Sequence, residues 1–175
     1  MISYLGSTRD LWLTFGGQNK TIEGFCNADW ASQKHWHLIS GFLFHYRVGA
    51  VLWSSKKQNV VSLSSMEAEY IVQMHAAKEA IWLRGFMSEM YGKKEKPLTI
   101  SCDNQGAIAL VKDNKFHSRT KHINLQYHFI HEAVEDGKIN VKYVPTDYNV
   151  LDIFTKALPK PKFQQMVDLL GLRRL

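Results

Sequence analysis

The sequence is poor in cysteine and has no long apolar run. Its 175 residues include two cysteines, Cys26 and Cys102, which provide neither a disulfide framework nor the spacing of a zinc site. No apolar segment approaches the roughly 20 residues needed to cross a bilayer, and residues 1–15 lack the plan of a signal peptide. Internal repeats, low-complexity segments and long linkers are missing too. These absences favour a single domain over 1–175 in a reducing, intracellular (cytoplasmic) compartment.

Acidic residues are outnumbered by basic ones. The chain has 22 Lys and Arg against 16 Asp and Glu, a formal net charge of +6. This excess favours a polyanionic partner such as nucleic acid, while each basic run taken alone is also what an ordinary solvated surface carries. The basic residues gather at 56–57, 93–94, 112–121 and 156–162 rather than in one tail.

Hydrophobic periodicity predicts an α/β domain. Alternating apolar residues indicate strands at 11–15, 21–29, 38–46, 50–54, 98–102 and 139–144, with a turn at Val48-Gly49 and a polar connection at 56–59. Helices are expected at 64–90, 105–112, in a segment ending near 136–137, around Asp152 and at 163–170. A strand–helix–strand order implies parallel pairing by right-handed crossover. The sequence therefore predicts a mixed five-stranded sheet, three antiparallel strands followed by parallel additions, with helices on both faces.

Acidic residues recur where these elements begin or end. On the strand 21–29, Asn27 and Asp29 share one face and Cys26 lies on the other. Glu67 precedes Tyr70 by three residues and is expected to share the sheet-facing side of the helix 64–90, whereas Glu69, rotated by about 200°, is expected to point away. Asp103 follows a predicted central strand, and Asp152 lies in the first turns of a helix. Each has a simpler explanation as a helix cap or as a charge favourable at a helix N-terminus. Together they favour a shared oxygen-rich site for hard divalent cations.

Several longer words in the sequence resemble one family. They are CNADWAS (26–32), SGFLF (40–44), WSSKKQ (53–58), LSSMEAEY (63–70), AAKEAIWLR (76–84), ISCDNQGAIAL (100–110), FHSRTKHI (116–123), YVPT (143–146), DIFTKALPKPKF (152–163) and LLGL (169–172). In this order they are similar to the RNase H domain of copia-type LTR retrotransposon polyproteins. The resemblance implies an RNase H-like fold over nearly the whole chain, in which residues 1–20 look like the end of the preceding polymerase connection region and 159–175 form the C-terminal helix.

What the family does is then expected here. The resemblance implies an endonuclease that cuts the RNA strand of an RNA–DNA hybrid with two Mg²⁺ ions, for which Mn²⁺ can substitute. Its four acidic positions map to Asn27, Glu67, Asp103 and Asp152, with Asp29 as a further metal-ligand candidate. Asn27 stands where the family has aspartate. The amide removes a negative charge and one good oxygen ligand, so cleavage is expected to be impaired while hybrid binding survives; an engineered change and natural decay of the element both explain it.

Substrate contacts follow from the chemistry of a hybrid, which displays phosphates and 2′-hydroxyl groups. The polar residues expected to bind nucleic acid are Ser64, Ser65, Asn104 and Gln105, with Lys56, Lys57, Arg119 and Lys121 as candidate phosphate contacts. Partners are expected to be the hybrid and, in a polyprotein, the reverse transcriptase domain. Three alternatives stay open: a catalytically silent nucleic-acid-binding domain, an interaction module, and another nuclease or integrase of the same superfamily. Trp30 and the histidines are expected to be structural, and both cysteines to be buried thiols facing away from the acidic residues.

Overall fold

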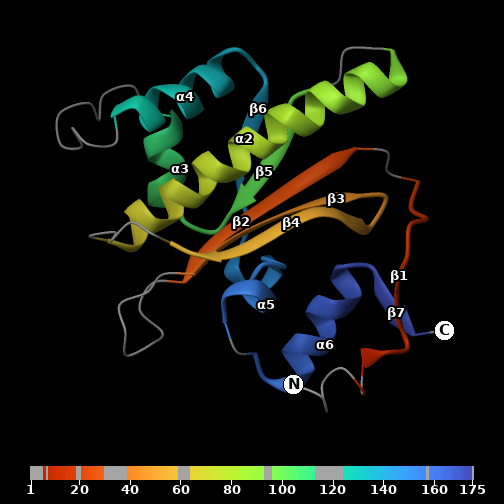
Figure 1. Ribbon diagram of the computed structural model, residues 1–175. Helices are drawn as coiled ribbons and strands as arrows, with labels where there is room; N and C mark the ends of the chain where they lie inside the picture. The colour runs from red at the N-terminus through yellow and green to blue at the C-terminus, as the bar shows by residue number, and fades with distance from the viewer. Residues whose placement is uncertain are drawn as a thin grey trace.

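The computed structural model describes residues 6, 8–18, 21–29, 39–58, 64–92, 96–112, 124–156 and 158–174 (Figure 1). Its strands and helices are β1 (Leu11–Leu13), β2 (Ile22–Asp29), β3 (Ile39–Tyr46), β4 (Gly49–Lys57), α2 (Ser65–Tyr91), β5 (Leu98–Cys102), α3 (Gln105–Lys112), α4 (Asn124–Glu135), β6 (Ile139–Tyr143), a 3₁₀ turn η1 (Thr146–Tyr148), α5 (Asp152–Thr155), α6 (Lys160–Leu169) and β7 (Leu172–Arg174). This confirms the predicted α/β class.

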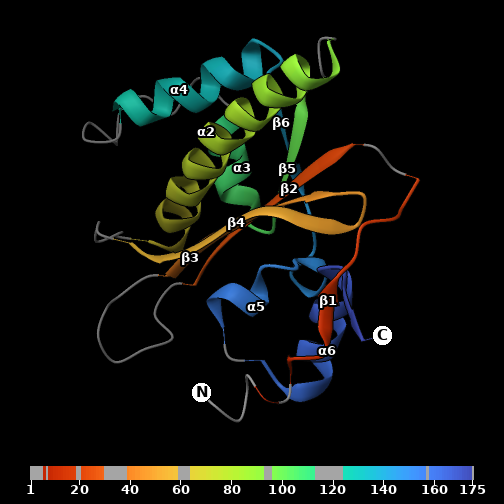
Figure 2. The ribbon, with the colours of Figure 1, turned by 45° about the vertical axis from the view of Figure 1, so that its right-hand side comes forward.

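Five strands form the central sheet in the order β4-β3-β2-β5-β6. Strands β2, β3 and β4 pair antiparallel, and β5 joins β2 and β6 in parallel. Figures 1 and 2 show α2, α3 and α4 on one face of this sheet and α5 and α6 on the other. The mixed sheet with helices on both faces is as the sequence predicts. Because β2 and β5 are neighbouring parallel strands inside the sheet, their C-terminal ends lie side by side at one end of it.

The long helix α2 is fixed at both ends by its own sequence. The Ser64 hydroxyl accepts a hydrogen bond from the Glu67 backbone N–H at 3.2 Å, as an N-cap does. At the other end Gly92 adopts φ +64°, a left-handed conformation that glycine accepts without strain, and its N–H bonds to the Ser88 carbonyl. The predicted helix 64–90 is confirmed.

The face that α2 turns to the sheet differs from the predicted one. Glu69 and Gln73 reach residues of β2 and β5, so the sheet-facing side is a stripe one residue earlier than the expected stripe. The stripe comprises Glu69, Gln73, Ala76, Ala80, Leu83 and Met87, and all six are buried. Tyr70, Met74 and Ala77, which were expected to face the sheet, are buried as well because α3 and α4 cover α2 from the other side. A helix covered on two sides carries two apolar stripes, and the sequence pattern alone does not separate them.

The C-terminal end was expected to be one helix over 159–175, which was wrong: α6 ends at Leu169 and is followed by the strand β7, which the sequence did not predict. Strand β7 pairs antiparallel with β1 in a separate two-stranded sheet, and the Thr14 N–H bonds to the Gly171 carbonyl at 2.8 Å. Three residues are too short to show alternation, so β7 had no sequence signal. Two boundaries also differ. Strand β4 continues through Lys57 instead of giving way to a polar connection at 56, and the β3–β4 turn lies at Arg47-Val48.

Candidate nuclease site

The first half of the site is a buried cluster of Glu69, Cys102 and Asp103 beside the end of β2. One ligand atom from each lies within 4.8 Å of the other two. Glu69 is 4% exposed, and its Oε1 accepts a hydrogen bond from the Ala28 backbone N–H at 2.8 Å while its Oε2 lies 3.7 Å from the Cys102 Sγ. Asp103 follows directly after β5 and is half-buried. Carboxylate and thiolate groups in this arrangement can hold a divalent cation.

The second half is built around Asp152 on the opposite face of β2. The Asn27 amide Nδ2 donates to the Asp152 Oδ1 at 2.9 Å. The Lys156 ammonium donates to the same oxygen at 2.8 Å, and the Lys162 ammonium donates to Oδ2 at 2.9 Å. Asn27 and Asp152 are 2% and 1% exposed, so the bond between them is shielded from water, whereas the two lysine side chains reach Asp152 from partly exposed positions. Both oxygens of Asp152 are therefore engaged by nitrogen donors.

The two halves meet at consecutive residues of β2. The Asn27 side chain bonds to Asp152, and the next backbone N–H, that of Ala28, bonds to Glu69. Among the described residues, the cluster of potential metal ligands does not extend to Asp152. The sequence predicts one site shared by all the acidic positions. The structure instead has two adjacent groups, Glu69 with Cys102 and Asp103, and Asn27 with Asp152.

The electrostatics of the two halves are opposite. Burial raises the pKa of Glu69 to about 9, and the nearby Cys102 adds to the effect, while the hydrogen bond from Ala28 opposes it. Burial would also raise the pKa of Asp152, but the hydrogen bonds and charges of Lys156 and Lys162 outweigh it and hold that pKa below its usual value. Glu69 is accordingly neutral near pH 7 in the cation-free protein, whereas Asp152 is ionised.

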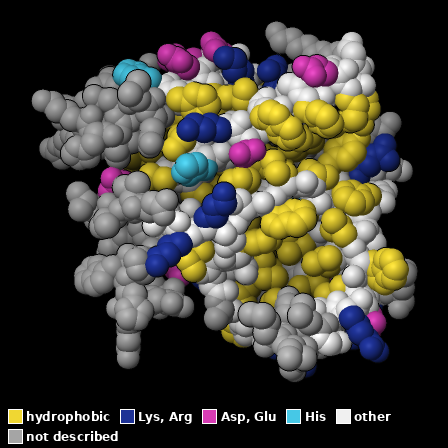
Figure 3. Space-filling model, in the orientation of Figure 1, with side chains coloured by type: hydrophobic (Ala, Val, Ile, Leu, Met, Phe, Trp, Pro, Cys, Tyr) yellow, Lys and Arg dark blue, Asp and Glu magenta, His cyan; other side chains and the backbone are white. Residues whose placement is uncertain are grey.

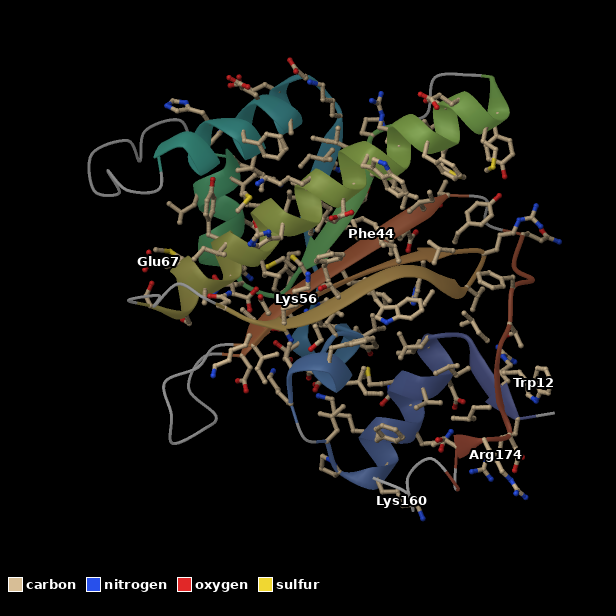
Figure 4. All side chains as sticks on the ribbon, in the orientation of Figure 1. Trp12, Phe44, Lys56, Glu67, Lys160 and Arg174 are labelled. Carbon is tan, nitrogen blue, oxygen red and sulfur yellow. The ribbon has the colours of Figure 1, made fainter. Side chains whose placement is uncertain are left out.

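The predicted position of Glu69 was wrong. We expected it to point away from the sheet, and it is the glutamate of α2 that contacts β2 and β5. Glu67, expected to face the site, lies half-buried in the first turn of α2, where its backbone completes the Ser64 cap (Figure 4). The described ligand cluster contains Glu69 and not Glu67. The cause is the one-residue offset of the sheet-facing stripe.

The cysteines were only partly anticipated. They do lie on neighbouring central strands, since the β2–β5 register pairs Phe25 with Ser101, and both are fully buried. The expectation that Cys102 faces away from the acidic residues was wrong, because its sulfur lies beside Glu69. A hydrogen bond from Cys26 lowers the pKa of Cys102, whereas this contact and burial raise that of Cys26 well above its usual value. No spacing rule pointed to Cys102, and Lys156 and Lys162 were predicted only as part of a basic run.

The two halves of the site differ in whether their donor atoms could hold a divalent cation. Glu69, Cys102 and Asp103 present two carboxylates and a sulfur around one point, a donor set that fits one divalent cation. The Asn27–Asp152 half does not fit a second cation as arranged, because two ammonium groups already lie against the carboxylate and the neighbouring amide points its nitrogen there. The further candidate Asp29 has its Oδ2 buried without a hydrogen-bond partner.

Six of the eight predicted nucleic-acid contacts lie at the ends of the elements that carry the site or neighbour it. Lys56 and Lys57 are exposed at the end of β4, and the next residue, Gln58, donates to the Ala68 carbonyl in the first turn of α2. Ser65 and Gln105 are exposed at the starts of α2 and α3. Ser64 and Asn104 act as caps, since the Asn104 Oδ1 accepts from the Ala107 N–H at 3.0 Å. Figure 3 shows Lys and Arg side chains scattered among hydrophobic ones over the face of the molecule seen in Figure 1. Arg119, Lys121, Trp30, His117 and His122 lie outside the described residues.

Other features of the described residues are structural. The buried His131 pairs its Nε2 with the Leu110 carbonyl at 2.9 Å, which agrees with the expectation of structural histidines. Within the part of the chain that the structure covers, no helix has the length and apolar character to cross a membrane.

Comparison with known proteins identifies relatives for almost the whole chain. It is 39% identical over 173 residues to the retrovirus-related Pol polyprotein from transposon TNT 1-94 of Nicotiana tabacum. It is also 34% and 33% identical to those from transposons RE1 and RE2 of Arabidopsis thaliana. These matches cover 98%, 91% and 98% of this chain, which spans 11 to 13% of the length of the polyproteins. No family model matches the chain.

Solved structures give the fold. The N-terminal RNase H domain of a Mycobacterium tuberculosis protein, fused to maltose-binding protein, superposes with a TM-score of 0.55 at 12% identity, covering 85% of this chain and 98% of that one. LC11-RNase H1 in complex with an RNA/DNA hybrid gives 0.54 at 11% identity, covering 74% of this chain and 88% of that one. The protein has the RNase H fold and belongs with the copia-type Pol polyproteins of plant transposons.

Proposed function

We propose that this chain is a ribonuclease H domain that binds RNA–DNA hybrids and cleaves their RNA strand poorly because of Asn27. The observation that carries the proposal is the contact between Asn27 and Asp152 beside the Glu69–Asp103 pair, in the RNase H fold. Divalent cations such as Mg²⁺ or Mn²⁺ would supply the Lewis acid and activated water of hydrolysis. In a longer polyprotein, the natural partner is the reverse transcriptase domain. The assignment of residues 1–20 to the end of a polymerase connection region stays a prediction.

The acidic residues have distinct roles in this proposal. Glu69 and Asp103 hold the cation, and Glu69 takes the role that the family resemblance implied for Glu67. Asp152 matches the family's fourth acidic position, and the ammonium groups of Lys156 and Lys162 pair with its carboxylate. Asn27 contributes an amide nitrogen where a carboxylate oxygen would complete the donor set. These residues can orient a scissile phosphate, but they lack the charge for tight binding of two cations.

Reversion of one residue tests the proposal. Asn27→Asp should raise Mg²⁺-dependent hybrid cleavage by about 100-fold or more, since a cation's transition-state stabilisation is several kcal/mol and each 1.36 kcal/mol is tenfold. Hybrid affinity measured in EDTA should change little. If the revertant binds hybrid and still does not cleave, the domain is a silent nucleic-acid-binding module, and if neither form binds hybrid at low salt, the proposal fails.

A matched pair of glutamates tests the site assignment in the Asn27→Asp background. Glu69→Gln should abolish the restored cleavage because it removes a carboxylate that contacts β2 and β5. Glu67→Gln, two residues away on the same helix, should keep it within a few-fold. Asp103→Asn should behave like Glu69→Gln. The reverse ranking of the two glutamates would restore Glu67 as the ligand.

A further inference from the structure

The second half of α2 presents hydrophobic side chains to solvent, on a surface that the nuclease proposal does not use. Trp82, Phe86 and Met90 follow one another at intervals of four residues and are 59%, 48% and 54% exposed. The Trp82 and Phe86 rings stack, with centroids 5.7 Å apart and planes 10° apart. On the face drawn in Figure 3, hydrophobic side chains gather over this part of α2. A single exposed hydrophobic residue is ordinary, but an ordered group on one helix face is typical of a protein–protein contact.

Gly85 lies on the same exposed side of the helix, and the fold gives no reason for a glycine there. Among the described residues, no heavy atom lies within 4 Å of a Cβ placed on Gly85, and its backbone is not in the left-handed region. Glycine inside a helix is destabilising relative to alanine because it loses more backbone freedom on folding. It does leave a notch beside Trp82, into which a side chain of a second molecule can pack.

The exposed residues of this segment have the spacing of an antiparallel helix pair. Lys78, Trp82, Gly85 and Glu89 are all exposed, and the steps of four, three and four residues between them are those of a coiled-coil seam. When two copies of a helix pack antiparallel about a two-fold axis, residues at equal distances on either side of the axis lie opposite each other. An axis midway between Trp82 and Gly85 places Trp82 of one copy opposite Gly85 of the other. The same axis places Lys78 opposite Glu89, because both pairs share that midpoint.

Both opposing pairs are complementary. The large indole of Trp82 meets the notch at Gly85, and the Lys78 ammonium meets the Glu89 carboxylate, and symmetry makes each contact occur twice. The Lys78 ammonium lies 5.9 Å from the centre of the Phe129 ring in α4, so its position is partly fixed before association. We propose that the second half of α2 is a homodimer interface, in which two copies of this chain pack antiparallel through Lys78, Trp82, Gly85 and Glu89.

This interface is small and lies away from the nuclease site. The exposed parts of Trp82 and Phe86 offer roughly 200 Å² of aromatic surface per copy, since a fully covered aromatic side chain buries about 150–250 Å². Stable complexes bury about 800 Å² per partner, so this dimer should be weak and should dissociate on dilution. At a rise of about 1.5 Å per residue, Lys78 lies about 13 Å further along α2 than Glu69. The seam therefore shares no residue with the acidic cluster.

Two exposed tryptophans provide a matched test. Sedimentation velocity of the full chain in EDTA, from about 5 to about 500 μM, should show a monomer that becomes a dimer as the concentration rises. Trp82→Ala should weaken association at least about tenfold, whereas Trp53→Ala, at a 55% exposed position of β4, should leave it unchanged. A monomer at every concentration, or equal effects of the two variants, overturns the proposal. No nucleic acid is present, so the result is independent of whether the chain binds or cleaves hybrid.

Filling the notch separates the interface from the stability of the helix. Leucine has a higher helix propensity than glycine, so Gly85→Leu should retain or raise the midpoint of urea unfolding. The same change should weaken dimerisation at least about tenfold, because the added side chain occupies the space that Trp82 of the second copy needs. A dimer that persists unchanged in Gly85→Leu forms through another face and refutes the seam.

Charge reversal tests the register of the two helices. Lys78→Glu and Glu89→Lys each place like charges opposite each other, twice by symmetry, and each should weaken dimerisation by about fivefold or more. The double variant Lys78→Glu, Glu89→Lys restores opposite charges and should recover the affinity of the parent chain. Single reversals without effect, or a double variant as weak as the single ones, would contradict the antiparallel pairing.

Discussion

At the scale of single residues, Glu69 is a carboxyl group held in a place where ionisation is unfavourable. Its side chain is 4% exposed, and the charge of Asp103 and the thiol of Cys102 lie nearby. Burial raises its pKa from an ordinary 4.5 to about 9. A bound cation would reverse this preference, because a nearby positive charge favours the ionised carboxylate.

The stability of the cation-free protein should therefore depend on pH through Glu69. Between pH 4.5 and 9 the folded protein keeps a proton on Glu69 that the unfolded chain has lost, so the free energy of unfolding falls as pH rises through this window. Glu69→Gln cannot ionise and should lose this slope. In EDTA, urea unfolding at pH 5 and 9 should show a fall larger in the parent chain than in Glu69→Gln, by at least about 1.4 kcal/mol, the equivalent of one pKa unit.

Glu67→Gln is the control for that experiment and should retain the parent slope. Equal slopes in the parent and Glu69→Gln would mean that Glu69 is already ionised in the folded protein. The comparison uses differences between variants, so other buried groups such as His45, whose pKa burial lowers, cancel.

The sequence predicted the position of a site residue correctly where that residue follows the end of a strand. It was wrong where the position depends on which face of a helix meets the sheet. Asp103 follows a strand whose end is set by the run 98–102, and Asp152 follows β6 by a short connection, so both could be placed from order alone. Glu67 and Glu69 differ by about 200° around α2, and the deciding information is which stripe meets the sheet. That choice depends on α3 and α4 packing behind α2, which the local pattern does not contain.

At the scale of elements, the turn of the β3–β4 hairpin is formed by two residues in a strained backbone conformation. Arg47 and Val48 have φ values of +50° and +74°, in the left-handed region. A tight hairpin requires positive φ at both turn positions and normally uses Asn and Gly there, so a β-branched valine is out of place. The sequence placed this turn one position late because Gly49 is the usual turn residue, but in the fold Gly49 begins β4 against the Phe15 ring.

Val48→Asn should relieve that strain. Asparagine tolerates the left-handed conformation, and the side chain of Val48 is 44% exposed, so little burial is lost. The free energy of unfolding should rise by about 1 kcal/mol in urea denaturation. Val51→Asn, at a 39% exposed position within β4, should instead destabilise because strands disfavour asparagine. A loss of stability in both variants would show that the turn is not strained by Val48.

The packing of strand β7 against the β3–β4 hairpin can be tested by comparing two glycines with left-handed backbone conformations. A Cβ at Gly171, φ +76°, would lie 2.8 Å from the Val48 carbonyl oxygen, whereas a Cβ at Gly92, φ +64°, meets nothing within 4 Å. Gly92→Ala should cost about 1 kcal/mol from the backbone alone. Gly171→Ala should cost at least about 1 kcal/mol more, because it also forces β7 away from the hairpin. Thermal unfolding of the two variants measures the difference, and equal losses would contradict the contact.

At the scale of the whole molecule, the positive charge favours a polyanionic partner, and the fold indicates at which end of the sheet it would bind. The net charge of +6 attracts a polyanion without choosing a face. The fold does choose one, because parallel β2 and β5 end together at the site, and β4 ends with Lys56 and Lys57 beside the first turn of α2. The mixed sheet and its parallel additions were predicted from the alternation of strands and helices, whereas the strand order was not. The pairing of β1 with β7 joins residues too far apart for any local pattern.

This placement predicts how hybrid binding responds to salt. Each phosphate neutralised by a lysine contributes about −0.9 to the slope of log affinity against log salt. Replacing both Lys56 and Lys57 by alanine should weaken hybrid binding in EDTA and reduce the slope by about 2 if each contacts one phosphate. The double variant Lys96→Ala, Lys138→Ala removes the same charge at the opposite end of β5, where the Leu98 N–H bonds to the Lys138 carbonyl. Its slope should match that of the parent chain. Equal effects of the two double variants between 50 and 200 mM salt would mean that hybrid is attracted by net charge alone, and that the sheet end carrying Glu69, Asp103 and Asp152 is not where it binds.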